Sequence, residues 1–392
     1  MPLRRPLVLA GLLVALILGY ALRSQFSQSE LPFGQPIQPP KPLPLSGKNS
    51  AGNRTEERTC DGIPLPCIPD PPKSPQPGAV WTPSDDGPNG ITRVTQNASL
   101  LLSSKRFADL DALIERYNTL QYRLDDGRFK LSVVGLFFEQ SLGANGDSID
   151  SELESWVKAN PKSAGAAIAT ATAWGNAAWR ARGNGTANTV SSEGWKLLHE
   201  RLQRALAVLR ESESYASSNP LWYTEYMQVN LGLEVPLSEQ LALYERGTKA
   251  FPDFFPLHMQ MMVALLPQWH GSYKAEAAFI DLASARSPPA VRAEIYTRLW
   301  WRANQLTDLD VDIFRDMGAS WPRMKEGFES LMKTYPNSRW NRSNFAAFAC
   351  DAGDVSTYVR LRAELGEKIY SNAFPPNASI DVCDARAAGK RT

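Results

Sequence analysis

Two arginines beside a glycine-rich turn are the first side chains in this sequence that could bind a ligand. In "WRARGNGTANTV", Trp179, Arg180 and Arg182 precede Gly183 and Gly185. Guanidinium groups form forked hydrogen bonds to carboxylates and phosphates, although the Gly-Lys-Ser/Thr of a nucleotide-binding loop is missing. We therefore take Trp179, Arg180 and Arg182 as the candidate ligand-binding residues. The alternative is that the arginines cap a helix end and stack on tryptophan.

A histidine in "LLPQWHGSYKAEAAF" resembles the edge of an active site. His270, however, has no neighbouring cysteine, serine nucleophile or second histidine. Pro267 and Gly271 both disfavour a continuing helix, and Ser272 is a suitable N-cap for the residues that follow. The stretch therefore predicts a turn between two helices.

Acidic residues are the remaining candidates for chemistry. Asp308, Asp310 and Asp312 alternate as in a calcium loop, but the required glycine and glutamate are replaced by Ile313 and Ala319. We expect a solvated acidic turn and no metal site.

Two other acidic positions could serve a hydrolase. These are the pair Asp125–Asp126 and the single Glu139 after "GLFF". Nothing in the sequence sets the geometry of these acids, so we predict no catalytic residue and no cofactor.

The four cysteines indicate disulfides. Cys60 and Cys67 enclose turn-forming residues in "CDGIPLPC", while Cys350 and Cys383 lie far downstream. In an oxidising compartment the sequence-local pairing, 60 with 67 and 350 with 383, is our prediction. Cys350 could instead be a buried thiol.

Composition narrows the class of protein. The chain has 392 residues, a net charge of +1 and only three histidines, which argues against nucleic-acid binding and against zinc. Eleven tryptophans are many for this length, and all but Trp81 follow residue 150.

The N-terminal quarter of the chain is unlike the rest. Arg4 and Arg5 precede an uncharged run from Pro6 to Leu22, which is near the lower length limit of a membrane helix and also close to a signal-peptide core. We expect residues 1–25 to form an uncleaved single span, or else a cleaved signal segment, with the remainder exported to the periplasm. Residues 26–92 carry about half of the 29 prolines and predict a flexible Pro-rich linker.

Residues 93–392 predict an all-α domain, because apolar residues recur at three- and four-residue spacing. Two segments of this domain show the pattern clearly, and their apolar residues are given next. In 99–120 they are Leu100, Leu101, Phe107, Leu110, Leu113, Ile114 and Tyr117; in 193–213 they are Trp195, Leu198, Leu202, Leu206 and Leu209. We expect most tryptophans of this domain to fill space between helix layers: Trp156, Trp174, Trp179, Trp222, Trp300, Trp301 and Trp340.

A repeated design runs through this domain. Three predicted helices end in Lys-x-x-Pro, at Lys158, Lys249 and Lys333, where a cation complements the helix dipole and proline stops the helix. Each second helix should then run to a glycine, namely Gly183, Gly271 and Gly353. Pro220 precedes Pro252 by 252 − 220 = 32 residues, close to the tetratricopeptide period. Such pairs bury their faces by stacking, which predicts an α-solenoid.

The motifs "LDDGRFKLSVVGLFFE", "AAWRARGNGTANTVSSEGW", "NPLWYTEYMQVNLGL", "PLHMQMMVALLPQWHGSYKAE" and "YPNSRWNRSNFAAFACDAGD" together resemble a bacterial family, domain of unknown function 4034. The resemblance extends over about residues 95 to 385. It implies tetratricopeptide-like helical repeats, often in exported proteins, and brings no established activity and no catalytic residue.

We therefore expect a helical-repeat protein, tethered to the inner membrane and facing the periplasm, that binds a protein or peptide partner of the cell envelope without catalysis. One alternative is a cell-envelope hydrolase on a helical scaffold, and another is a structural part of a larger assembly. A deep pocket with two converging acids would favour the enzyme, whereas an open groove of aromatics and arginines would favour binding.

Overall fold

The fold is known from a computed structural model, which describes the backbone of residues 59–60 and 63–64 and the chain over 87–146, 148–269, 271–308, 310–375 and 378–390. The expected membrane segment, residues 1–25, lies outside the described residues, as does most of the expected linker. Within the described part of the chain, no helix is long and apolar enough to cross a bilayer.

The described body is predominantly helical, as the sequence predicts. Its helices are, in chain order, α2 (Gly87–Ser103), α3 (Phe107–Thr119), α4 (Lys130–Ser141), α5 (Ser151–Ala159), α6 (Ala164–Arg182), α7 (Ser192–Ala216), α8 (Pro220–Gly232), α9 (Leu237–Ala250), α10 (Pro256–Ala264), α11 (Tyr273–Arg286), α12 (Arg292–Leu306), α13 (Trp321–Thr334), α14 (Arg339–Asp351), α15 (Val355–Leu365) and α16 (Ile380–Ala387). The short 3₁₀ turns are η1 (Ala187–Thr189), η2 (Gly366–Lys368) and η3 (Ser371–Ala373). The two-residue strands form antiparallel pairs, β1 (Thr59–Cys60) with β2 (Ile63–Pro64) and β3 (Ala144–Asn145) with β4 (Ser148–Ile149).

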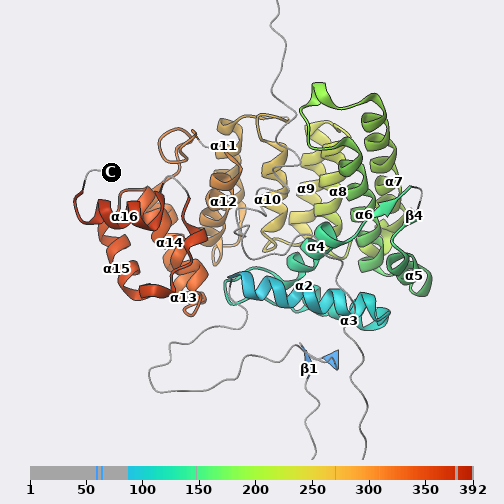
Figure 1. Ribbon diagram of the computed structural model, residues 1–392, viewed down its shortest axis with the longest axis horizontal. Coiled ribbons are helices and arrows are strands. Elements are labelled where there is room, and N and C mark those ends of the chain that lie inside the picture. The colour runs from blue at the N-terminus through green and yellow to red at the C-terminus, as the bar shows by residue number, and fades with distance from the viewer. Residues whose placement is uncertain are drawn as a thin grey trace, which may run out of the picture.

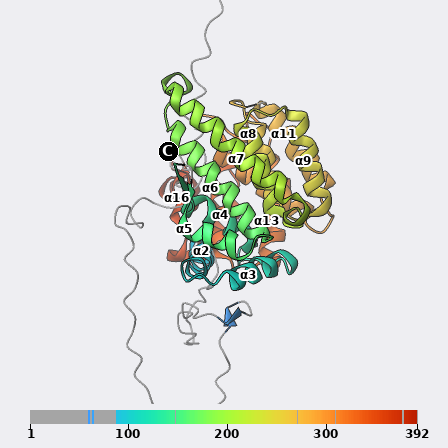
Figure 2. The ribbon, with the colours of Figure 1, turned by 90° about the vertical axis from the view of Figure 1, so that its right-hand side faces the viewer.

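From α5 to α16 the helices form a stack of two rows. Each helix packs against the next one in the chain, and α6, α8, α10 and α12 also pack against one another in turn (Figure 1). Figures 1 and 2 show the long helices α6 and α7 running alongside each other. One hydrophobic cluster extends from Ile91 in α2 to Cys383 in α16, so the stack shares a continuous core. This is a helical-repeat-like architecture.

The Lys-x-x-Pro segments end their helices with the same backbone geometry. The C-cap residues of α5, α9 and α13 are Asn160, Phe251 and Tyr335, with φ/ψ of −131°/74°, −133°/68° and −123°/62°. Each of these residues precedes a proline, whose ring excludes the α conformation from the residue before it. The same local sterics therefore stop the first helix of all three pairs at the same point.

The second helices of these pairs differ from the expectation at one position. Gly183 and Gly353 follow α6 and α14 with φ of +75° and +74°, which favours glycine. The helix α10 instead ends at Ala264, well before Gly271, and no positive φ occurs at Gly271. A side chain at Gly271 would collide with the backbone of Leu265, so this glycine serves a close approach of two backbone segments.

The N-terminal helices lie across the stack. In Figure 1, α2 and α3 run crosswise beneath it, and α2 contacts α5 near one end and α14 near the other. The connection from α3 to α4 contains a tight hairpin, residues 123–129, which we call the clasp loop. The Leu124 amide donates to the Arg128 carbonyl at 2.7 Å, and Arg123 pairs with Phe129 as a β-bridge.

The start of the body corrects the expected boundary. Helix α2 begins at Gly87, so residues 87–92, which we assigned to the linker, are helical. Pro88 occupies the first turn of α2, where a missing amide proton costs no helical hydrogen bond, so its presence is compatible with a helix.

The expected apolar faces are buried with two exceptions. Leu100 is 39% exposed and Trp195 is 38% exposed, while the other residues of the two predicted faces are buried. Leu100 lies about 100° around the axis of α2 from the buried Leu101, so it is turned away from the core. Trp195 lies on the buried face of α7 but in its first turn, where the packing of neighbouring segments decides how far it is covered.

Candidate functional site

The arginines that the sequence singled out serve the backbone around them. Both Nη1 hydrogen bonds of Arg182 go to carbonyls of the following turn, at Gly183 and Gly185 (3.0 Å each), and its guanidinium lies 5.1 Å from the Trp195 ring. The exposed Arg180 donates from Nη2 to the Ala144 carbonyl at 3.4 Å. Arg182 thus binds the turn that follows α6 and lies near a tryptophan, as in the alternative interpretation, whereas Arg180 binds the backbone of β3.

Trp179 faces a neighbouring helix pair. Its ring lies 6.4 Å from that of Trp269 in an edge-to-face arrangement, and it is half-buried. The three candidate side chains therefore do not converge on a common ligand position.

The other sequence candidates are separated as well. His270 lies outside the described residues, while Ser272 caps α11 by accepting from the Ala275 amide at 3.2 Å. The acidic turn before α13 is stabilised locally, because Asp312 accepts from the Phe314 and Arg315 amides. Among the described residues, no group of three or more His, Cys, Asp or Glu is placed to hold a metal ion.

Two of the four cysteines can be placed. Cys350 in α14 and Cys383 in α16 form a disulfide with Cα atoms 5.8 Å apart. The predicted 60–67 pair lies outside the described side chains.

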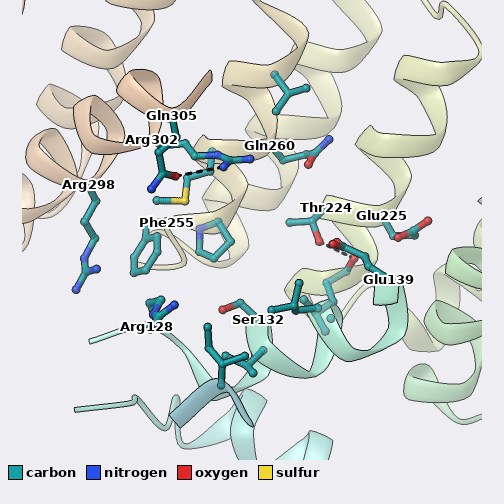
Figure 3. A pocket seen from close by; sticks show the side chains of 18 of the residues that line it. Arg128, Ser132, Glu139, Thr224, Glu225, Phe255, Gln260, Arg298, Arg302 and Gln305 are labelled. Atoms are coloured by element: carbon teal, nitrogen blue, oxygen red, sulfur yellow. Dashed lines mark hydrogen bonds between the residues drawn. The ribbon is translucent and has the colours of Figure 1, made fainter. Parts of the chain in front are cut away.

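The candidate site is a pocket on the face formed by α6, α8, α10 and α12, which we call the inner row, and it is closed on one side by α4. It has a volume of about 290 Å³ (Figure 3). That volume is at the lower end of the range for small-molecule sites. The pocket is lined by Ile91, Arg128, Ser132, Val133, Gly135, Leu136, Glu139, Ile168, Thr172, Leu221, Thr224, Glu225, Phe255, Pro256, Met259, Gln260, Val263, Arg298, Trp301, Arg302, Gln305 and Trp340.

Two acids lie in this pocket. Figure 3 shows Glu139 from α4 and Glu225 from α8 on the same side of it. Glu139 is exposed to the pocket but lies deep in the molecule, and this desolvation raises its pKa to about 7, against the opposing attraction of Arg302. Burial raises the pKa of Glu225 to about 8, with the Glu139 charge adding to the effect and a 2.9 Å hydrogen bond from Thr172 opposing it.

A single arginine faces these acids from α12. The guanidinium of Arg302 donates to Gln305 Oε1 at 3.4 Å, a long contact for a charged donor. Burial lowers the pKa of Arg302, while Glu139 and Glu276 raise it. Glu276 on α11 is fully buried and, among the described residues, has no hydrogen-bond partner for either carboxylate oxygen. Burial raises the pKa of Glu276 to about 8, against the attraction of Arg302.

The other two arginines of the pocket hold the clasp loop in place. Arg128 binds Asp126 Oδ2 through Nε (3.0 Å) and Nη2 (2.5 Å), and Gly87 donates its amide to the same oxygen at 3.1 Å. Arg298 donates to the Asp126 carbonyl and to Glu294, both at 2.7 Å. The Asp125–Asp126 pair, which we weighed as catalytic, thus contains a fully buried structural carboxylate at Asp126.

Sequence reasoning found Glu139 and missed Glu225, Arg302 and Glu276. A signal was present, because each of the three is a charged residue inside an apolar helical run, as in "LWYTEYMQV" and "RLWWRANQL". Charged residues are seldom buried unless they are paired or functional. The sequence does not show that α8, α11 and α12 bring these side chains into one region of the fold.

Fold and site together define a predominantly helical, helical-repeat-like protein with a charged pocket on its inner row. Residues 95–219, about a third of the chain, match a family model described as Domain of unknown function (DUF4034). The match is shorter than the expected extent to residue 385, and it ends before α8 begins. No curated protein matches the chain, and no solved structure matches it.

Proposed function

We propose that this chain is a binding protein whose inner row of helices, with the pocket at its centre, receives a protein or peptide partner without carrying out chemistry. The observation that carries the proposal is Arg302, a charged group held on a rigid helix inside a pocket and left with one long hydrogen bond. A stack of helices keeps such a group in place before any partner arrives, which reduces the entropy cost of binding. The pocket walls include Phe255, Trp301 and Trp340, which offer apolar contact beside the charge.

A tetratricopeptide-like α-solenoid is the finer form of this proposal. The identical C-cap geometry of α5, α9 and α13 supports it, because it marks the same point of three helix pairs. The inner row would then be a recognition surface of the kind that stacked repeats present.

We also propose that the body works outside the cytoplasm, in the periplasm, held to the inner membrane by residues 1–25 or released if that segment is cleaved. The disulfide between Cys350 and Cys383 supports this location, because structural disulfides persist in oxidising compartments. Alkaline phosphatase, which folds actively only after export, can be fused after Thr392. An active fusion is expected, and an inactive but stable fusion would refute the location.

Site-specific photo-crosslinking tests the binding proposal. A crosslinking amino acid is placed at Gln260, which lines the pocket, and in a matched strain at Glu239, which is exposed on the outer helix α9. Crosslinking in intact cells is followed by purification and mass spectrometry. Reproducible partners at Gln260 and none at Glu239 are expected, and the absence of any product at Gln260 would refute the proposal.

A hydrolase remains a second candidate because of one observation, the Glu139–Glu225 pair in the pocket. Their pKa values of about 7 and about 8 would let one carboxyl donate a proton and the other act as a base near neutral pH. Purified protein is incubated with cell-wall polymer, and soluble fragments are quantified for the native chain, Glu139→Gln and Glu225→Gln. Release by the native chain that both variants lose would establish the enzyme, whereas no release would exclude this activity on that polymer.

A further inference from the structure

The charged groups of the pocket divide into those that the fold uses and those that it does not. Arg128 and Arg298 are each bound at 3.0 Å or less to Asp126, and Arg298 is also bound to Glu294. Among the described residues, Arg302 by contrast shows a single side-chain hydrogen bond, at 3.4 Å, to the side chain of Gln305. A guanidinium carries five N–H donors, so most of the hydrogen-bonding capacity of Arg302 is unused by the contacts that the structure shows.

The two carboxyl groups on the acidic side of the pocket differ in their hydrogen bonding. Glu225 is 8% exposed and accepts from the Thr172 hydroxyl at 2.9 Å. Glu139 is exposed to the pocket, and among the described residues no hydrogen bond or ion pair to its side chain is seen. A carboxylate that faces the pocket without such a partner can accept charge-assisted hydrogen bonds from a cation bound beside it.

Arg302 and Glu139 attract each other but do not meet. They lie on facing sides of the pocket, on α12 and α4, and among the described ion pairs none joins them within 4.0 Å (Figure 3). Opposite charges fixed apart on two rigid helices leave a gap between them. A ligand that carries a cation at one end and an anion at the other would span this gap and pair both groups.

The space between the charges suits a small ligand with an apolar part. The pocket volume is about 290 Å³, which is small for a drug-sized molecule. Leu136, Met259 and Val263 line the same space, so the wall between the two charged sides is apolar. Gln305 and Gln260 add side-chain amides on the Arg302 side (Figure 3).

We propose that the pocket binds a zwitterion, an amino acid or the two ends of a short peptide, with its ammonium group at Glu139 and its carboxylate at Arg302 and Gln305. This assignment rests on the proposed binding function and names its ligand class. Glu225 lies on the same side of the pocket as Glu139 and adds a second carboxyl near the ammonium position (Figure 3).

Calorimetry on the intact chain tests the assignment. The twenty standard amino acids and the dipeptides Gly-Leu and Leu-Gly are titrated, and the strongest binder is then compared with its amide, which lacks the carboxylate, and with its N-acetyl form, which lacks the ammonium group. Each blocked form should bind at least about tenfold more weakly, because each loses a charge-assisted pair. The free amino acids and the dipeptides distinguish a metabolite site from a peptide site. Failure of the whole set to bind at millimolar concentrations, or equal binding of the blocked forms, would overturn the proposal.

Two variants assign the ends of the ligand. In Arg302→Gln the zwitterion should bind no better than its amide, while binding of the amide itself stays unchanged. In Glu139→Gln the zwitterion should bind no better than its N-acetyl form, while binding of the N-acetyl form itself stays unchanged. Arg360→Gln, which removes an exposed arginine of α15 outside the pocket, is the matched control and should bind as the native chain does. Loss of all binding in Arg302→Gln with native circular dichroism would contradict the assigned orientation.

The outcomes separate this inference from the proposed function. If crosslinks at Gln260 persist while no zwitterion binds, the binding function stands and the ligand class is wrong. If zwitterions bind and no protein is captured at Gln260, the ligand class stands and the protein partner is wrong.

Discussion

Single residues of this chain show how the same side chain can serve the fold or remain available to a ligand. Arg182 and Arg298 both have guanidinium groups bound to backbone carbonyls, so their charge stabilises a turn and a loop. Arg302 lies in a similar setting but has little of its capacity used. The number and length of hydrogen bonds distinguish these roles, whereas residue type and local sequence do not.

Glu276 gives a prediction about pH and stability. Its folded-state pKa is about 8, raised by burial, whereas an unfolded glutamate has its ordinary value of 4.5. Between these two pH values the unfolded chain releases the proton that the folded chain keeps, so the free energy of unfolding falls as pH rises from 4.5 to 8 and is not affected by this group below 4.5. Glu276→Gln should remove that decline. Between pH 5 and pH 8 the variant should therefore gain roughly 2–4 kcal/mol in free energy of unfolding relative to the native chain.

Urea unfolding at pH 5 and pH 8 measures this difference, with the exposed Glu239→Gln as control. A Glu276→Gln variant whose stability depends on pH just as the native chain's does would show that Glu276 titrates normally.

At the scale of elements, glycines and prolines decide where the helices stop and where the chain crosses them. The residues before Pro161, Pro252 and Pro336 end three helices in one conformation. The clasp loop uses a glycine differently. Gly127 has φ of +86°, and a side chain there would collide with Arg298 and Tyr335. Glycine therefore lets the loop approach α12 and the end of α13 without strain or collision.

Gly127→Ala and Gly183→Ala form a matched pair that separates strain from collision. Both positions have positive φ, but around Gly183 the structure leaves open space. Alanine should cost about 1–3 kcal/mol at Gly183, from backbone strain alone at φ/ψ of 75°/−179°, and about 1–3 kcal/mol more than that at Gly127, where overpacking adds to the strain. Chemical denaturation measures both. Equal losses would mean that the clasp loop moves aside at little cost.

The disulfide between α14 and α16 gives a prediction about covalent stabilisation. It links residues 33 apart, so its loss should increase the entropy of the unfolded chain. Cys350→Ser is expected to lower the free energy of unfolding by roughly 2–4 kcal/mol. Cys383→Ser and the double variant should lose the same amount, because all three remove one bond. A much larger loss in the double variant would show that the cysteines stabilise the fold separately.

For the whole molecule, the N-terminal helices join parts of the stack that are distant in sequence. The Asp126 carbonyl accepts from Arg298 Nη2 at 2.7 Å and from Asn341 Nδ2 at 3.1 Å, and the Asp126 carboxylate accepts from the first amide of α2. The clasp loop thus ties α2 to α12 and α14. The pocket owes its closed side to this arrangement, because α4 follows the clasp loop directly.

Hydrogen exchange tests that connection. Asn341→Ala removes one bond to the clasp loop, whereas Asn344→Ala, three residues on in the same helix and equally buried, removes a bond to the carbonyl of Trp340 within α14. Losing the contact to the clasp loop should cost about 1 kcal/mol, so amides of residues 87–103 and 123–130 should exchange about fivefold faster in Asn341→Ala than in Asn344→Ala. Equal rates in the two variants would mean that Asn341 does not hold these segments together.

The sequence by itself determined the features that depend on local sterics and periodicity. Apolar spacing predicted the helical body, and Lys-x-x-Pro predicted three helix ends correctly, because helix propensity and the clash before proline act within a few residues. The proline-rich composition wrongly placed residues 87–92 in the linker, because proline is tolerated in the first turn of a helix.

Only the tertiary structure decided the candidate site. Glu139, Glu225 and Arg302 are separated by 86 and 77 residues along the chain (225 − 139 and 302 − 225), and no spacing rule connects them. They line one pocket because α8 and α12 stand in the inner row while the clasp loop sets α4 against that row. Burial then shifts their pKa values, and burial is a property of packing between distant segments, which local sequence does not contain.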